Sequence, residues 1–563
     1  MVRRLVWQQS EGIKELNEPW SGPLFPERSV MRLLLALFAL SSLLGHAATV
    51  FADEISLDQL RTARKQAAER PRRIIFNNDG NEPVYLCRDN TPEELLRHRT
   101  SPLAGTQVDS IFYCTWSSGF GMFTHDTKVG HVFKTREDLF SRNRIEDMLA
   151  AGTDPLRVMT DFGQKNNIEI FWSFRMNDTH DAGLSGYGPV MFRANPLKLA
   201  HPDWLIGKPD QRPKFGGWSA VNFSHPEVRD LALKFVEEVC RNYPVHGIEL
   251  DFFRHPVFFQ RAAQTGTSCN DEERALMTQL IRDMRAVTEV EGRKRGTPIL
   301  LSARVPDSMK YCHDIGLDLE TWFQEDLLDL LVTTGYFQLN PWSYSAELGR
   351  KYHLPVYPSL DESRVRDESA RKLRMSVAAY RGRALAARYS GLPGVYLFNA
   401  FNPHHSIWRE LGDPDQLVTL PHDYFASIRG VGAAAGGALP HRPDQDAATL
   451  NPGAPLPVIF DKPAETEFYT GADLTRTGTN ATPQVTLRLQ FDKPSPEHLN
   501  VEFNGERLSN GKAAGNWMEY ALKPEQLPPG KNKVAVQLNE KSSPLKWTDL
   551  HCTVRWPVSK PQP

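Results

Sequence analysis

The sequence lacks the short patterns that many metal and redox sites require. Its 563 residues include six cysteines, and no two of them form a C-x-x-C pair, which excludes a zinc ribbon or a thioredoxin-like motif. There is no H-x-H and no H-E-x-x-H pattern, so the usual spacing of a zinc hydrolase is missing. We therefore expect no metal ion and no cofactor, and the cysteine spacing leaves disulfide pairing open.

The chain also lacks an excess of charge and, with one exception, long apolar runs. Its net charge of −2 gives no reason to expect a nucleic-acid partner or an anionic membrane. The exception begins at Met31 and Arg32, continues through an apolar run over 33–44 and ends in small residues before Asp53. This pattern predicts a signal peptide cleaved near Ala52, with Met31 as the true start and an exported protein without a membrane span. A membrane anchor is the alternative, although the run is short for a bilayer.

Short apolar segments ending in polar residues alternate with helical segments along most of the chain. Eight such segments predict strands, at 72–79, 108–119, 167–178, 245–255, 297–308, 327–340, 354–363 and 392–402. Eight strands alternating with helices predict a (β/α)8 TIM barrel. A doubly wound open sheet would alternate similarly, but polar clusters at the ends of nearly all eight segments favour the barrel, whose sites lie at those ends.

The clearest predicted helix lies in the stretch SHPEVRDLALKFVEEVCRNY, which starts at Ser224. Apolar residues recur there every three or four positions from Val228 to Val239 and form one stripe. Ser224 and Glu227 fit a capping box, with Pro226 in the first turn.

The composition changes near residue 430, where Gly, Ala and Pro become frequent. Beyond this stretch, apolar and polar residues alternate with a period of two, at 484–491, 499–505 and 532–540. The pattern predicts a small all-β sandwich. We therefore expect an upstream segment and signal peptide over 1–52, a barrel over 53–429, a linker over 430–457 and a β-sandwich accessory domain over 458–563.

One predicted strand carries two acids, in the stretch HGIELDFFRH that begins at His246. Alternate side chains of a strand face opposite sides, so Glu249 and Asp251 share one face and Ile248 and Leu250 the other. In a barrel the apolar pair packs outward, and both carboxylates point into the mouth. Arg254 would hold one of them ionised by proximity. The alternative is a buried structural network of the two acids with Arg254.

The surrounding segment, NFSHPEVRDLALKFVEEVCRNYPVHGIELDFFRHP (222–256), resembles the glycoside-hydrolase-family-ten-like barrels. It shares their PEVR helix, the aromatic turn, the GI pair and an acidic strand end followed by R-x-P. Two positions depart from that pattern: His246 stands where an Asp is usual, and Asp251 is followed by Phe252 rather than a second acid. The resemblance implies a sugar-acting barrel.

Glycoside hydrolysis typically uses two carboxyl groups, one of which stays protonated. Asp251 is the first candidate and Glu249 the second, and a partner is expected from another strand end. Asp361 and Glu362 follow the seventh predicted strand, although Glu362 could instead begin the next helix.

Several other polar or aromatic residues follow predicted strands and are candidates for binding the substrate: Arg175, Asn177, Asp178, His180, Trp116, Trp172, Arg304, Tyr336 and Asn399, together with Arg254. Each aromatic residue of this set could equally belong to the core.

Three functions agree with these features. The first is an exported glycoside hydrolase acting on a poly- or oligosaccharide by carboxylate acid/base chemistry. The second is a carbohydrate-binding barrel without catalysis. The third is a metal-dependent hydrolase or deacetylase using His180, Asp181 and the acids of the first predicted strand, which the missing zinc motifs count against. A metal ion could also be bound by His125, Asp126, His180 and Asp181.

Overall fold

The computed structural model describes residues 55–116, 119–334, 338–360, 367–426, 456–476, 481–494, 499–509, 511–538 and 544–557. Its first part is an eight-stranded parallel sheet in the order β10-β1-β2-β5-β6-β7-β8-β9. These strands are β1 (Ile74–Asn78), β2 (Val108–Tyr113), β5 (Glu169–Arg175), β6 (Gly247–Asp251), β7 (Leu300–Val305), β8 (Leu330–Thr333), β9 (Val356–Pro358) and β10 (Val395–Leu397). Each lies within one of the eight predicted segments.

The two ends of this sheet meet just beyond β9. Ser359 forms a parallel bridge with Tyr396 of β10, and the Leu360 amide donates to the Tyr396 carbonyl at 2.8 Å. The sheet therefore closes into the predicted barrel, and an open doubly wound sheet is excluded.

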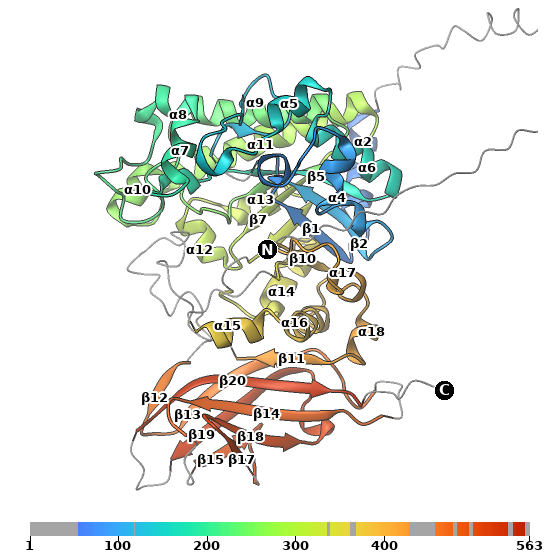
Figure 1. Cartoon of the computed structure of the whole chain (residues 1–563), viewed down its shortest axis with the longest axis vertical. Helices are drawn as coiled ribbons and strands as arrows, with labels where there is room; N and C mark the ends of the chain where they lie inside the picture. Colours follow the sequence, from blue (N-terminus) through green and yellow to red (C-terminus); the bar gives the residue numbers. More distant parts are fainter. Residues whose placement is uncertain are drawn as a thin grey trace, which may run out of the picture. The chain divides into compact units, whose positions relative to one another are not determined.

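Helices follow the strands in sequence and surround the barrel (Figure 1). The longer ones are α2 (Leu57–Ala68), α6 (Pro155–Asn166), α9 (Pro226–Asn242), α11 (Asp271–Arg295), α14 (Trp342–Tyr352) and α16 (Val377–Tyr389). Shorter ones are α3 (Glu82–Tyr85), α4 (Pro92–Arg97), α5 (Ile145–Ala150), α7 (Gly188–Arg193), α8 (Pro196–Ala200), α10 (Gln260–Thr265), α12 (Met309–Asp314), α13 (Leu319–Gln324), α15 (Glu368–Arg374), α17 (Ile407–Glu410) and α18 (Pro414–Val418). No helix within the described ranges is both long and apolar enough to cross a membrane.

Helix α9 buries the predicted stripe, with Val228, Phe235 and Val239 in the core. Its predicted capping box is wrong. The helix begins at Pro226 with His225 as N-cap, and no side chain caps it. Ser224 therefore lies one position before the N-cap, too early to reach the third helical amide.

Strand alternation separates two apolar layers. Ile75, Phe112, Phe171, Val332 and Tyr396 form a cluster of their own that fills the barrel interior, as in other barrels of this size. The alternate positions, including Ile248 and Leu250 of β6, join the larger core cluster that also contains the α9 stripe. At the start of β5, the buried Arg72 guanidinium donates to Glu169 at 2.7 Å.

The second part of the chain is the predicted β-sandwich, seen in orange and red in Figure 1. One sheet runs β11-β20-β14-β18-β17, with β12 also paired to β20, and the other runs β13-β19-β15-β16. The strands are β11 (His422–Phe425), β12 (Val458–Phe460), β13 (Ala464–Thr470), β14 (Gln484–Phe491), β15 (Leu499–Phe503), β16 (Glu506–Arg507), β17 (Lys512–Ala514), β18 (Trp517–Leu522), β19 (Gly530–Leu538) and β20 (Leu545–Arg555).

Strand β11 precedes the expected linker yet pairs with β20 over four residues. Most of the linker lies outside the described residues. Buried contacts join the helices after β9 to the sandwich: Arg374, at the end of α15, donates to both carboxylate oxygens of Asp549 at 2.8 and 2.6 Å. Gly382 and Gly471 lie so close to neighbouring backbone that a Cβ would come within about 2.0 Å of it. All six cysteines are buried and free, so the structure contains no disulfide among them.

Candidate active site

Strand β6 places both acids of the HGIELDFFRH stretch inside the barrel. It lies between β5 and β7, and Asp251 is in register with Arg175 on one side and Arg304 on the other. Glu249 and Asp251 are 0% and 2% exposed, while Ile248 and Leu250 face the outer core. The apolar strand accommodates two carboxyl groups because both are surrounded by polar partners.

Glu249 is the deeper of the two acids. Its Oε1 accepts hydrogen bonds from Ser173 Oγ at 2.6 Å, Tyr396 OH at 3.0 Å and Asn77 Nδ2 at 3.4 Å. Among the described residues no donor reaches its buried Oε2. Burial and then the nearby Asp251 raise the pKa of Glu249 to about 8, against the opposing effect of Arg304. The raised pKa favours the neutral, protonated form of Glu249 at pH 7.

Asp251 has the opposite environment. Its Oδ1 accepts from the backbone amides of Phe253 at 3.0 Å and Arg254 at 3.1 Å. The buried Arg304 guanidinium lies 3.6 Å from Oδ2 and 4.1 Å from the centre of the Phe398 ring. These donors stabilise a negative charge on Asp251.

The cation paired with Asp251 differs from the expected one. Arg254 contributes its backbone amide to Asp251, and its guanidinium lies 2.6 Å from Nε2 of His180. Arg304 of the neighbouring strand forms the ion pair instead. The reason is register, since the side chain opposite Asp251 on β7 points into the same barrel interior.

A second polar network lies at the ends of β1 and β5. Arg175 contacts Asp79 at 2.5 Å and Asp178 at 3.3 Å. Asp178 also accepts from the amides of Gly119 and His180, both at 3.0 Å. Burial opposes the charge of Asp178, but His180, His255 and Arg175 together hold its pKa well below the usual range.

Asp178, His180 and His255 bring three possible metal-ligand atoms within 4.8 Å of one another. Their lone pairs are already engaged, however. The Thr179 amide donates to Nδ1 of His255 at 3.2 Å, and Nδ1 of His180 lies 2.8 Å from Asp178. Arg175 and Arg254 place two positive charges beside the group. The donor set therefore fits a hydrogen-bonded array better than a divalent cation.

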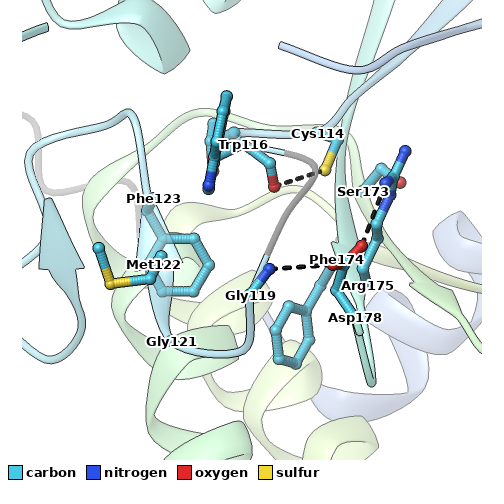
Figure 2. Close-up of a pocket in the computed structure, with 11 residues that line it drawn as sticks. Cys114, Trp116, Gly119, Gly121, Met122, Phe123, Ser173, Phe174, Arg175 and Asp178 are labelled. Carbon is cyan, nitrogen blue, oxygen red and sulfur yellow. Dashed lines mark hydrogen bonds and ion pairs between the residues drawn. The ribbon is translucent and has the colours of Figure 1, made fainter. Parts of the chain in front are cut away.

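A small cavity adjoins this network between the ends of β2 and β5. Its walls include Trp116, Gly119, Ser173, Arg175 and Asp178, and its free volume is about 10 Å³, enough for one water molecule. Figure 2 shows Arg175 and the Gly119 amide both directed at Asp178 on one side of it. This cavity is far too small for a sugar ring.

The next candidate substrate-binding residues are two tryptophans and two asparagines. Trp172 is fully buried in the outer core, and Trp116 is 4% exposed and stacks on Phe133 with ring centres 4.2 Å apart. The Asn177 amide bridges the carbonyls of Val221 and Val257. These three side chains support the loops rather than face a ligand. Asn399 lies just after β10 in the left-handed region, at a φ of 60°.

Of the remaining candidates, Tyr336, Asp361 and Glu362 lie outside the described residues. His125, proposed for a metal site, is buried with Nδ1 2.8 Å from Thr115 Oγ1, and it is not a member of the Asp178, His180 and His255 group.

The sequence analysis missed Ser173, Tyr396 and Asn77 as partners of Glu249. The alternation of side chains along β5 could have identified Ser173. Ser173 and Arg175 alternate with the apolar Trp172 and Phe174, so the polar pair faces the interior.

Comparison with known proteins adds family information to this geometry. The family model for glycosyl hydrolase-like 10 matches residues 89–276, a range that includes β2, β5 and β6. No curated protein matches the sequence significantly.

Among solved structures, the chain is similar to the GH36 alpha-galactosidase AgaA from Geobacillus stearothermophilus, with 12% identity and a TM-score of 0.36 over 87% of this chain and 56% of that chain. The chain thus spans little more than half of that enzyme. It is also similar to the glycoside hydrolase domain of PgaB (BpsB) from Bordetella bronchiseptica, with 12% identity and a TM-score of 0.38 over 61% of this chain and 98% of that chain.

The family match covers the strand that carries Glu249 and Asp251, and it agrees with the resemblance of the 222–256 segment. Residues 89–276 are therefore similar in sequence to glycosyl hydrolase-like 10 proteins, as the 222–256 segment predicted.

Proposed function

We propose that the protein is an exported glycoside hydrolase that cleaves a poly- or oligosaccharide by carboxylate chemistry. The observation that carries the proposal is the pair of inward-facing acids on β6, which have opposite electrostatic surroundings. Glycoside hydrolysis requires one ionised and one protonated carboxyl group, and these surroundings leave Asp251 as the ionised one, with Glu249 neutral beside it. The family match supports the same reaction class.

Asp251 is the reacting carboxylate in this proposal. Two backbone amides and Arg304 stabilise its negative charge, which suits a nucleophile or a general base rather than an acid. Hydrolysis breaks the bond between the anomeric carbon and the leaving oxygen, water supplies the new oxygen, and a second carboxyl group gives its proton to the leaving oxygen.

Glu249 has a positioning role. Its neutral carboxyl group leaves Asp251 and Arg304 as a balanced pair of one negative and one positive charge, which costs less in a buried site than two carboxylates beside one guanidinium. Its Oε1 accepts hydrogen bonds from Ser173, Tyr396 and Asn77. These bonds hold the side chains next to Asp251 in place.

The proton donor is proposed to be Glu362 or Asp361, which follow β9. A separation of about 5–5.5 Å from Asp251 would give retention of anomeric configuration, and about 6.5–9.5 Å would give inversion. Arg175, Arg254 and Arg304 are proposed to orient the substrate or the acids.

The direct test is incubation of the purified protein with a panel of polysaccharides and detection of new reducing ends. We expect release from at least one polymer and a loss of at least about 100-fold in Asp251→Asn. Binding without release, unaffected by Asp251→Asn, would favour the carbohydrate-binding alternative.

Export is proposed from the segment that begins at Met31. The amino-terminal sequence of the protein recovered from the periplasm or medium should begin close to Asp53. A mature protein that keeps residues 33–44 would instead be anchored.

A further inference from the structure

The chain leaves β8 through a residue in an unfavourable backbone conformation. Thr334 has a φ of 71°, in the left-handed region that β-branched side chains rarely adopt. The other non-glycine residues that the structure describes with a positive φ are Asn, Asp, His and Trp, so Thr334 is the β-branched exception among them. Such strain persists only where the surrounding contacts enforce it, and it gathers at functional sites.

Two hydrogen bonds hold Thr334 in this conformation. Its amide donates to the carbonyl of Val305, at the end of β7, at 3.1 Å. Its hydroxyl donates to the carbonyl of Ser359, just beyond β9, at 2.9 Å. Thr334 and Ser359 are both buried, so water does not compete for these bonds. Thr334 therefore ties together the ends of β7, β8 and β9.

Ser359 lies where the barrel closes. Its amide donates to the Thr333 carbonyl at 2.9 Å, and it forms the parallel bridge with Tyr396 of β10. The Tyr396 hydroxyl in turn donates to Glu249 at 3.0 Å. The backbone that Thr334 holds is thus paired with the strand that carries a partner of Glu249.

The Ser359 side chain leads to the second acid of β6. Nη2 of Arg304 lies 3.5 Å from Ser359 Oγ, and Nη1 of the same guanidinium lies 3.6 Å from Asp251 Oδ2. Both contacts are long for hydrogen bonds, so neither of them fixes the guanidinium alone. A shift of Ser359 would therefore change the distance between Arg304 and Asp251.

We propose that Thr334 is a positioning residue for the site on β6. Its hydroxyl holds Ser359, and Ser359 holds the partners of both Asp251 and Glu249. The inference rests on the proposed function and assigns a role to a residue that acts on both acids through other side chains. Reacting groups must stay within about 0.5 Å of the productive geometry, and a misplacement of about 1 Å can cost about 100-fold in rate.

Four variants of the full-length chain test this role. Thr334→Val keeps nearly the same shape and removes the hydroxyl, whereas Thr334→Ser keeps the hydroxyl. Ser359→Ala removes the contact with Arg304. Thr333→Val is the matched control, because the Thr333 hydroxyl is also buried but lies 3.1 Å from Ser345 Oγ of the surrounding helix α14.

The first measurement is turnover of the hexasaccharides of the cello-, chito-, xylo- and malto- series. On the series that the wild type cleaves, Thr334→Val and Ser359→Ala should each lower kcat about 5- to 20-fold, the effect of one lost buried hydrogen bond, and leave KM within about twofold. Thr334→Ser should restore the wild-type kcat, and Thr333→Val should retain it. Equal kcat values in Thr334→Val and Thr333→Val would make Thr334 a purely structural residue.

The second measurement needs no activity. Crystal structures of wild type, Thr334→Val and Thr333→Val give the distance between Arg304 Nη1 and Asp251 Oδ2. We expect Thr334→Val to lengthen it by about 1 Å, the scale of a harmful misplacement, and Thr333→Val to leave it unchanged. If Thr334→Val fails to fold, Ser359→Ala decides by the same two measurements.

The two measurements separate this inference from the proposed function. An unchanged distance in Thr334→Val, with cleavage by the wild type, would overturn the positioning role and leave the hydrolase intact. A lengthened distance, without cleavage of any hexasaccharide by the wild type, would support the hold of Thr334 on Arg304 and contradict the hydrolase.

Discussion

At the residue scale, Glu249 and Asp251 lie two positions apart on one strand and differ in charge because their neighbours differ. Asp251 receives two amides and a guanidinium. Glu249 receives only neutral donors, on one of its two oxygens. One anion and one cation therefore remain in this part of the barrel interior at neutral pH.

This charge arrangement predicts an alkaline limit to activity. Raising the pH through about 8, the pKa of Glu249, creates a second anion beside Asp251. We expect kcat/KM to fall there and the decline to disappear in Glu249→Gln, which stays neutral and nearly isosteric. A Glu249→Gln variant that is inactive at every pH would instead make Glu249 the proton donor.

The same group links stability to pH. Its folded pKa lies above its ordinary value of 4.5, so the folded state holds the proton between pH 4.5 and about 8 while the unfolded state releases it. The stability contributed by the neutral group is present below pH 4.5 and is lost as the pH rises through this window. In urea unfolding, Glu249→Gln should gain stability over wild type as the pH rises, by up to about 4 kcal/mol at pH 8. A constant difference would contradict the raised pKa.

At the element scale, strand parity correctly predicted which side chains face the barrel interior where a single strand was sufficient. The alternation in β6 was enough to place Glu249 and Asp251 inside and Ile248 and Leu250 outside. The same rule applied to β5 would have removed Trp172 from the substrate candidates, since it alternates with inward-facing Ser173 and Arg175.

Pairing between strands was not predictable from the sequence. The ion pair of Asp251 with Arg304 depends on the β6–β7 register, and no local sequence pattern predicts that register. Arg254 was preferred because it is near in sequence, yet the turn after β6 directs its guanidinium to His180. The capping box on α9 failed for a related reason, because a one-residue shift of the helix start removes it.

The position of Trp172 supports a prediction about stability. Its ring is fully buried and stacks on Phe174 with centres 5.1 Å apart. Trp172→Ala should lower the free energy of unfolding by about 3–5 kcal/mol, and the variant that remains folded should keep the wild-type KM. Unfolding in denaturant measures the stability, and steady-state kinetics measures KM. A raised KM with unchanged stability would indicate that Trp172 contacts the substrate.

At the scale of the whole molecule, the sandwich is joined to the barrel by more than the expected linker. Strand β11 crosses into the C-terminal sheet. Arg374 and Asp549 form a buried two-bond ion pair, and Tyr424 of β11 is buried. Period-two alternation predicted the sandwich strands, but His422–Phe425 is too short to identify as a member of a distant sheet.

These contacts predict how the molecule responds to a cut between residues 430 and 457. Limited proteolysis there should leave the two fragments associated, because β11 and Arg374 remain on the first and β20 and Asp549 on the second. Size-exclusion chromatography of the nicked protein should give one peak. Asp549→Asn, which leaves Arg374 buried without its carboxylate partner, should weaken the association and lower stability by about 3–5 kcal/mol. Two separate peaks from nicked wild type would show that these contacts do not hold the two fragments together.

The most direct test of the central claim combines turnover and thermal melting of one variant, Asp251→Asn. The account predicts that activity on the cleaved polysaccharide falls by orders of magnitude. It also predicts that the melting midpoint stays within a few degrees of wild type, because Glu249, freed from its neighbouring anion, can ionise and balance Arg304. A variant that is fully active but strongly destabilised would contradict the account and make Asp251 a structural carboxylate.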